Sequence, residues 1–319
     1  MDNSSTQGLV VNVSPHIRGG TTTKRIMLDV LIALFPAFVA SIILFGVRSI
    51  LVTCVCVVTC MLSEWLFEKA MKKQNTVGDL SACITGVLLA FNLPVSIPIW
   101  QAVFGSAVAI ILVKQLFGGL GKNFANPAIT ARIVMFLAFS ISMTTWNAPG
   151  GFSGILGSHD VMTGATPLAM MAKGDSESLP SILDMFLGMH GGSLGETCSF
   201  ALLMGGSYLL FRGTITWHAP VSFIATVFVF TAILGNSPVH AIFSGGLFLS
   251  AFFMATDYVT TPMTGAGRLI FGVGAGLLTG LFRLYGSYSE GASFAILLMN
   301  IVTPYINRLT ISKPMGARS

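Results

Sequence analysis

The sequence predicts an all-α polytopic membrane protein, with about ten transmembrane helices in two inverted five-helix repeats and a long outer loop. Three observations predict this class. Hydrophobic residues make up 53% of the 319 residues and charged residues only 9%, whereas soluble domains are about 25% charged. The mean hydropathy is +0.81. Apolar stretches close to the roughly 20 residues that a helix needs to cross the hydrocarbon core recur along the chain.

The apolar stretches form two groups, separated by one long polar interval. The first group predicts spans at 26–45, 49–67, 80–93, 97–117 and 128–143. The second predicts spans at 197–211, 215–234, 239–255, 269–284 and 292–306. The chain then divides into a cytoplasmic segment (1–25), a first transmembrane repeat (26–143), an outer loop (144–196), a second transmembrane repeat (197–309) and a cytoplasmic tail (310–319).

The basic residues predict the orientation of the spans, because Lys and Arg near span ends accumulate on the cytoplasmic side. With the N-terminus inside, most of them fall inside: Arg18, Lys24, Arg25, Lys69, Lys72, Lys73, Lys114, Lys122, Arg212, Arg268, Arg308, Lys313 and Arg318. Arg48, Lys173 and Arg283 fall outside. Both termini are therefore expected in the cytoplasm and the 144–196 loop on the outer face. The formal charge of +5 is a topogenic signal and gives no reason to expect nucleic acid as a partner.

An internal repeat is readable in the small-residue segments between spans. Segment 117–128 leads from one apolar span into the next, and segment 285–292 does the same in the second half. Five spans in each half is an odd number, so the halves would be inverted in the membrane. Inverted repeats with broken helices build transporter sites near the midplane. The candidate broken segments are 79–98 and 238–262; the alternative is that their prolines end ordinary helices.

The polar interval contains a motif with two hydroxyls, Thr163 and Thr166, on either side of Gly164-Ala165. Pro167 follows directly and fixes the backbone, which would hold Thr166 outward and rigid. The alternative is an ordinary turn, because Thr, Gly and Pro are common turn formers.

The sequence Thr163-Gly164-Ala165-Thr166 resembles the Ser/Thr-Gly-Ala-Thr motif that carries flavin mononucleotide (FMN) in the NqrB/RnfD family. This family provides membrane subunits to the Rnf complex and to the sodium-pumping NADH:quinone reductase. Segments 14–18 (SPHIR), 118–127 (GGLGKNFANP), 255–257 (ATD) and 261–262 (TP) resemble the same family. The resemblance covers nearly the whole chain, and the short N-terminus fits the Rnf branch better.

The resemblance implies that FMN is esterified through its phosphate to Thr166, which is an attachment point with no catalytic role. A separate flavin transferase would make the bond, with Asp160 and Thr163 shaping its recognition or the ring pocket. The resemblance also implies a second, non-covalent flavin, riboflavin, whose residues cannot be assigned from the sequence. A flavin held in this way can pass single electrons at the membrane surface.

The implied function is that of a flavin-carrying subunit of an ion-translocating ferredoxin:NAD+ oxidoreductase of the Rnf type in the bacterial inner membrane. It would move electrons across the bilayer, coupled to Na+ or H+ transport. The chain has no complete active site, so the other subunits (A, B, C, E and G) would supply the NAD and ferredoxin sites. Two alternatives stay open: the B subunit of the Na+-translocating NADH:quinone reductase, and a non-redox secondary transporter with inverted repeats.

Acidic residues in or against the membrane are functional candidates, because a charge there is costly. They are Asp29, Glu64, Asp79, Asp257 and Glu290. We expect Glu64, Asp257 and Glu290 to contribute to an ion pathway. The alternative is that Asp29 and Glu64 pair with nearby Lys or Arg, and that Asp257 caps a turn.

Arg132 is a basic outlier just inside a predicted span. We expect it to snorkel to the cytoplasmic interface; the alternative is that it holds a flavin phosphate or a partner carboxylate. The five cysteines have no ferredoxin-type spacing, so we interpret them as packing residues and leave open a cluster shared with another subunit. The five histidines have no metal-ligand spacing. The glycine-rich segment 272–276 lies inside an apolar span and predicts close helix packing.

Overall fold

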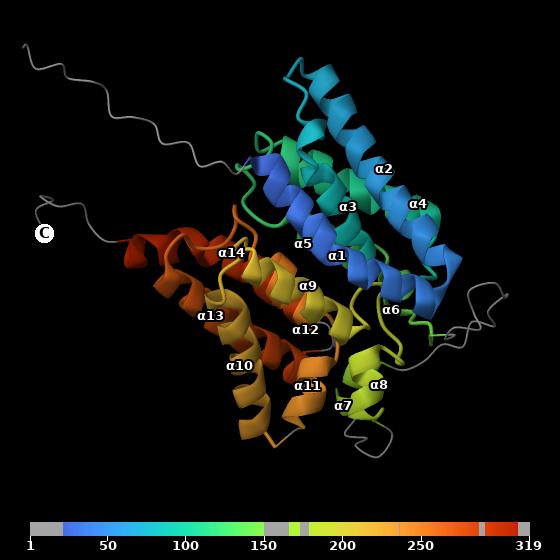
Figure 1. The fold of residues 1–319 in the computed structure, drawn as a ribbon, viewed down its shortest axis with the longest axis vertical. Coiled ribbons are helices and arrows are strands. Elements are labelled where there is room, and N and C mark those ends of the chain that lie inside the picture. Colours follow the sequence, from blue (N-terminus) through green and yellow to red (C-terminus); the bar gives the residue numbers. More distant parts are fainter. Residues whose placement is uncertain (1–21, 150–165, 173–178, 236, 287–290, 312–319) are drawn as a thin grey trace, which may run out of the picture.

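The computed structural model describes residues 22–149, 166–172, 179–235, 237–286 and 291–311, and every regular element in these residues is a helix. The helices form two groups that lie against each other (Figure 1), one built from α1 to α6 and the other from α9 to α14. Within the described residues three helices are long and apolar enough to cross a membrane, α1 (Thr23–Phe45), α2 (Val47–Ala70) and α13 (Gly265–Tyr285). Five shorter apolar helices accompany them.

The surface is apolar and the interior holds charges, the reverse of a soluble domain. Phe35, Ile141 and Phe211 are 62%, 84% and 92% exposed. Glu64 and Lys114, by contrast, are 0% and 2% exposed. Large apolar side chains on the outside suit hydrocarbon, and intramembrane charges typically face the bundle interior. The chain is therefore a multi-pass membrane protein.

The first group begins with α1 and α2, which meet at Gly46 in a left-handed conformation (φ 73°) that glycine adopts without strain. It continues through η1 (Val77–Asp79), α3 (Ser81–Phe91), α4 (Ile99–Ala107), the π-helical segment η2 (Val108–Gln115), α5 (Pro127–Ala138) and α6 (Ser140–Thr144). Helix α5 starts where it does because the Asn126 side chain accepts hydrogen bonds from two backbone N–H groups of its first turn, with Pro127 at the first position.

The second group begins after two short helices, α7 (Pro167–Ala172) and α8 (Ile182–Leu187). It comprises α9 (Ser199–Phe211), α10 (His218–Ile233), α11 (Pro238–Phe243), α12 (Leu247–Leu249), the π-helical segment η4 (Ser250–Met254), α13 and α14 (Gly291–Thr310). Helix α1 packs against α9, and α13 packs between α10 and α14.

Glycines let α13 approach α10 closely. A Cβ at Gly272 would lie 1.9 Å from Ser222 Oγ, and one at Gly276 would lie 2.6 Å from Thr226 Cβ. Both distances are far inside van der Waals contact, so only glycine fits. The prediction that segment 272–276 mediates close helix packing is confirmed.

The predicted spans coincide with helices, but two of them are not continuous. Span 128–143 changes direction at Phe139, between α5 and α6. Span 239–255 is divided between α11 and α12, where Gly245 has φ 60°. Arg283 stabilises this second break, because its guanidinium donates to the carbonyl oxygens of Ala241 (2.7 Å) and Ser244 (3.0 Å). Such compensation is what a broken helix inside a membrane requires.

The two candidate broken segments, 79–98 and 238–262, are both interrupted. Helix α3 ends at Phe91, and the backbone N–H groups of Leu194 and Gly195 donate to the carbonyls of Leu93 (3.1 Å) and Phe91 (3.0 Å). The last part of the predicted outer loop thus enters the bundle and satisfies the freed end of α3. Residues 190–197 therefore belong to the protein interior.

Candidate functional site

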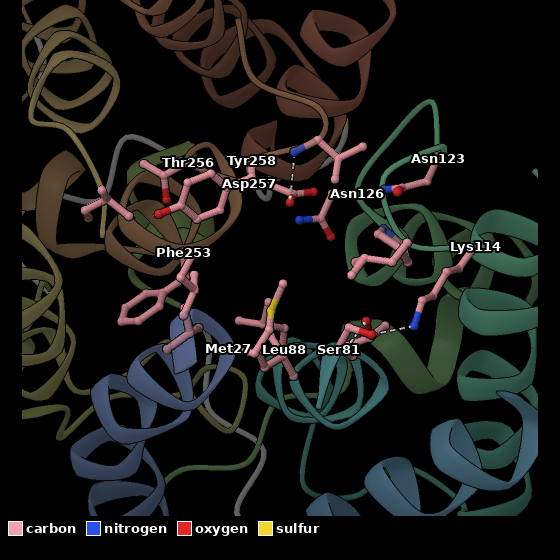
Figure 2. A pocket seen from close by; sticks show the side chains of 18 of the residues that line it. Met27, Ser81, Leu88, Lys114, Asn123, Asn126, Phe253, Thr256, Asp257 and Tyr258 are labelled. Atoms are coloured by element: carbon pink, nitrogen blue, oxygen red, sulfur yellow. Dashed lines mark hydrogen bonds between the residues drawn. The ribbon is translucent and has the colours of Figure 1, made fainter. Parts of the chain in front are cut away.

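A cavity of about 100 Å³ lies between the two helix groups (Figure 2). Met27, Leu88 and Phe253 give it apolar walls. Its polar lining comes from the two helix groups, with Ser81, Lys114, Asn123 and Asn126 on one and Asp257 on the other. An apolar cavity with a few converging polar groups is the usual form of a small-molecule site.

The two asparagines are held by the turn that precedes α5. Gly118, Gly119 and Gly121 all have positive φ values (113°, 93° and 87°), which glycine adopts without steric cost. The Asn123 amide donates to the Ala125 carbonyl (3.0 Å), and the Asn126 side-chain oxygen caps α5. The glycine-rich segment singled out in the sequence therefore forms one wall of the cavity.

Asp257 faces this cavity from the segment that follows η4. Its carboxylate accepts from Val259 N (3.5 Å) and Thr260 Oγ1 (3.2 Å), so the turn-capping interpretation is confirmed. The residue also lines a second cavity of about 380 Å³, together with Thr216 and Arg268. Asp257 thus stands between two cavities, a position that local capping alone does not require.

Glu64 lies in a buried polar cluster next to the first cavity. Its Oε1 atom accepts from Lys114 Nζ (2.6 Å), Gln115 Nε2 (2.9 Å) and Thr76 Oγ1 (3.2 Å). Gln115 Nε2 also donates to Glu68 Oε1 (3.3 Å), and Thr76 Oγ1 bonds to the same atom. The predicted pairing of Glu64 with a nearby lysine is confirmed. The sequence did not single out Lys114 or Glu68 for this cluster.

Asp29 also pairs, as the alternative interpretation expected. Its carboxylate accepts from Arg212 Nη2 (3.2 Å) and from Tyr208 Oη (3.3 Å), which links α1 to α9. The Arg212 side chain is 41% exposed and that of Asp29 only 11%, so the pair lies at the edge of the bundle between the two helix groups. Asp79 lies half-buried in η1.

Arg132 is 5% exposed and does not snorkel, so that prediction is wrong. Its Nη1 atom donates to Glu196 Oε1 (2.9 Å), Asn92 Oδ1 (2.8 Å) and Ser293 Oγ (2.9 Å). The reason is that residues 190–197, the end of the predicted outer loop, enter the bundle and bring Glu196 to Arg132. Glu196 is the partner carboxylate of the alternative interpretation. The Asn92 amide in turn donates to Met254 Sδ (3.9 Å). Asn92 belongs to segment 79–98 and Met254 to segment 238–262, so the two interrupted segments meet at this contact.

Thr166 is 7% exposed, so its side chain is covered and does not project outward as expected. Its hydroxyl accepts from Ala169 N (3.2 Å) at the start of α7. It lines a small cavity of about 10 Å³ with His190, Glu196 and Thr197. Burial lowers the pKa of His190 to about 4, so the imidazole is neutral near pH 7. Asp160, Thr163, Gly164, Ala165 and Glu290 lie outside the described residues.

The structure brings Thr166 and Arg132 together through Glu196, because Glu196 lines the Thr166 cavity and bonds to Arg132. Glu196 was not predictable as a site residue because it falls in a polar interval, and polar intervals are normally solvent-exposed loops.

Cys56 and Cys60 are buried in α2. Across the described part of the chain, no group of three or more His, Cys, Asp or Glu residues could hold a metal ion.

Known proteins are similar to this chain along nearly its whole length. Residues 10–316 match the model of the NQR2, RnfD, RnfE family. The chain is 44% identical to the D subunit of the Na(+)-translocating ferredoxin:NAD(+) oxidoreductase complex of Acetobacterium woodii, over 97% of this chain and 95% of that protein. It is 39% identical to the D subunit of the proton-translocating ferredoxin:NAD(+) oxidoreductase complex of Clostridium ljungdahlii, over 97% and 96%. It is 34% identical to the D subunit of the ion-translocating oxidoreductase complex of Ectopseudomonas mendocina, over 96% and 95%. The chain belongs to the NQR2, RnfD, RnfE family.

Proposed function

We propose that this chain is the D subunit of an ion-translocating ferredoxin:NAD+ oxidoreductase complex of the Rnf type. The observation that carries the proposal is the 44% identity to such a subunit along nearly the whole length of both chains. Electrons cross the bilayer through this chain, coupled to Na+ or H+ movement. Subunits A, B, C, E and G are its partners and hold the ferredoxin and NAD sites.

The ten-span inverted repeat is part of the proposal, and the packing of the helices supports it. If α9 to α14 repeat α1 to α5 about a two-fold axis in the membrane plane, helices near the axis should contact their own counterparts. Helix α1 packs against α9, and α5 packs against α14. With the basic residues as the guide, both termini are assigned to the cytoplasm and the loop that carries Thr166 to the outer face.

Thr166 carries FMN through a phosphoester in this proposal, after modification by a flavin transferase. The surroundings of Thr166 fit a phosphodiester. Both ring nitrogens of His190, Thr197 Oγ1 and Arg283 Nε are buried without a hydrogen-bond partner among the described residues. Each of these residues can donate a hydrogen bond, and phosphate oxygens are strong acceptors. The Arg283 guanidinium lies next to Gly245, since a Cβ at Gly245 would be 3.2 Å from Arg283 Nη2. Gly245 lines the same cavity as Thr166. FMN bound here supplies one-electron chemistry.

The cavity of Figure 2 is proposed as the site of the non-covalent flavin, riboflavin. Its apolar walls match the dimethylbenzene edge of the ring system, and the amides of Asn123 and Asn126 match the polar pyrimidine edge. The chain binds and orients the ring by these contacts and excludes water from it. Asp257 and Glu64 border the cavity region and are the proposed ion-pathway residues, with Glu290 as a third.

The Arg132 and Glu196 pair connects the two proposed flavin regions. Glu196 lines the Thr166 cavity, and Arg132 bonds to Asn92, the residue that follows α3. Leu88 of the same helix lines the cavity of Figure 2. We assign the pair a positioning role, in which it fixes the spacing between the two regions.

Inverted membrane vesicles containing the assembled complex test the proposal. We expect NAD+-dependent oxidation of reduced ferredoxin together with uptake of Na+ or H+ into the vesicles. Asp257→Asn should lower ion uptake more than electron transfer, whereas Lys24→Met, a change at an exposed lysine at the start of α1, should leave both unchanged. Electron delivery from NADH to quinone would instead support the quinone-reductase alternative, and a purified chain without flavin would support the transporter.

A further inference from the structure

Lys114 belongs to two sites at once. Its side chain lines the cavity of Figure 2, and its Nζ atom bonds to Glu64 Oε1 (2.6 Å) and to Ser81 Oγ (2.7 Å). Ser81 lines the same cavity. The ammonium therefore lies at the boundary between the cavity and the Glu64 cluster.

The Glu64 cluster has an unbalanced charge. Glu64 and Glu68 are 0% and 3% exposed, and Lys114 is the buried ammonium in this cluster among the described residues, bonded to Glu64. Gln115 and Thr76 add only neutral hydrogen bonds, and the nearby Lys73 is exposed and donates to the Gln115 carbonyl (3.5 Å). Two carboxylates with one ammonium leave one negative charge. Burial of uncompensated charge is unfavourable, so loss of the Lys114 ammonium from the cluster would leave two uncompensated carboxylates and favour uptake of a proton or cation in its place.

One acceptor of the cluster is open for that cation. Glu64 Oε2 is buried and has no hydrogen-bond partner among the described residues. The other oxygen of this carboxylate, Oε1, shares the Thr76 hydroxyl with Glu68 Oε1, so the two carboxylates lie close together. Oxygen ligands of this kind suit a proton or a hard monovalent cation. Lys114 also lies in the π-helical segment η2, and π-helical turns occur frequently at functional sites.

We propose that Lys114 is the residue that couples the charge in the cavity to cation binding at Glu64 and Glu68. Negative charge gained in the cavity attracts the Lys114 ammonium away from Glu64. The cluster then has two carboxylates without their ammonium, and it takes up a Na+ ion or a proton. When the charge leaves the cavity, Lys114 returns to Glu64 and displaces the cation. This inference rests on the proposed flavin in the cavity and gives Lys114 a positioning role.

Thermodynamic reciprocity makes the inference measurable without turnover. If reduction in the cavity favours cation binding, then cation binding must favour reduction by the same factor. The purified chain with Thr166→Ala carries no FMN at Thr166, so a redox titration reports the cavity flavin alone. We expect its midpoint potential to rise with the concentration of Na+ at fixed pH or, if the cation is H+, to rise with falling pH by more than the proton uptake of the flavin ring itself requires. This rise is the cation dependence that the titration measures, at constant ionic strength set by a large organic cation.

Three changes at Lys114 and one control complete the experiment. Lys114→Met should shift the midpoint potential to more negative values and remove its dependence on the cation. Lys114→Arg keeps the charge and should retain the dependence. The Glu64→Gln and Lys114→Met double variant removes the pair and keeps the net charge of the cluster unchanged, with Glu68 as its one carboxylate. It keeps the test open if Lys114→Met fails to fold. Lys24→Met, at an exposed lysine of α1, should behave as the parent chain.

The outcomes separate this inference from the proposed function. A midpoint potential that depends on the cation equally in the parent chain, Lys114→Met and the double variant would overturn the role of Lys114. Bound flavin whose potential ignores both cations in the parent chain would also overturn the coupling, while the cavity flavin would stand. A parent chain that retains no flavin would overturn the cavity flavin itself, and this inference with it.

Discussion

Arg132→Met should be one of the most damaging single substitutions in the interior of this protein. The side chains of Arg132 and Glu196 are 6% and 3% exposed, so both charges lie in the bundle. Removing one partner of a buried ion pair costs about 3–5 kcal/mol, because the other charge stays buried without compensation. The change also removes hydrogen bonds to Asn92 and Ser293, each worth about 1 kcal/mol. We therefore expect a loss of about 5–7 kcal/mol in the free energy of unfolding.

Unfolding in mixed micelles, titrated with sodium dodecyl sulfate and followed by tryptophan fluorescence, measures this loss. Arg212→Met is the comparison variant, because the Arg212 side chain is 41% exposed in its pair with Asp29. Hydration of this half-exposed pair should keep its loss well below that of Arg132→Met. The Arg132→Met and Glu196→Gln double variant removes the unpaired charge and should recover about 1–3 kcal/mol. A loss below about 1 kcal/mol for Arg132→Met, or no recovery in the double variant, would refute the buried pair.

Three further predictions concern packing, pH and modification. Gly272→Val should lower the free energy of unfolding by about 2 kcal/mol or more, because a Cβ at this position would lie 1.9 Å from Ser222 Oγ. Gly78→Ala, with nothing within 4 Å of the added Cβ, should change it by less than about 0.5 kcal/mol. Equal effects of the two substitutions would contradict the contact between α10 and α13. Because the pKa of His190 is lowered to about 4 in the folded chain, the unfolded chain binds a proton between pH 6.5 and about 4 that the folded chain does not bind. Between pH 7 and pH 5, the free energy of unfolding of the wild type should therefore fall by roughly 2 kcal/mol more than that of His190→Gln. Parallel pH profiles of the two proteins would show that His190 is not buried. Because the Thr166 side chain is buried, flavin transferase should modify the folded, purified apo chain much more slowly than the chain during its synthesis. The measurement is the amount of flavin incorporated per chain over time. Equal rates would show that the Thr166 side chain is exposed to solvent.

The helices were predictable because hydrophobic length is a strong signal in a membrane chain. Spans such as 26–45 and 269–284 coincide with α1 and α13 for this reason. The break between α11 and α12 was less accessible to sequence reasoning, since the apolar run continues through Gly245. What stabilises the break is Arg283, a residue some 40 positions further along the chain, and hydropathy carries no information about such a contact.

The site was only partly predictable for a related reason. Glu64 and Asp257 stand out because acidic residues are rare in apolar segments. Lys114 does not stand out, since a lysine at the end of a span is also the ordinary topogenic signal. Arg132 was wrongly predicted to snorkel, because its partner Glu196 comes from a polar interval that re-enters the bundle. Long-range contacts of this kind decide which charges are buried together, and the sequence spacing does not encode them.

The most direct test of the central claim is in-gel flavin fluorescence of this chain after denaturing electrophoresis, with Thr166→Ala alongside and the flavin transferase co-expressed. The denatured wild-type band should fluoresce, because a covalent phosphoester survives denaturation, and the Thr166→Ala band should be dark. The wild-type mass should exceed that of the unmodified chain by one esterified FMN. A dark wild-type band, with the transferase shown to be active on a second substrate, would contradict the assignment of this chain as a flavin-carrying electron-transfer subunit.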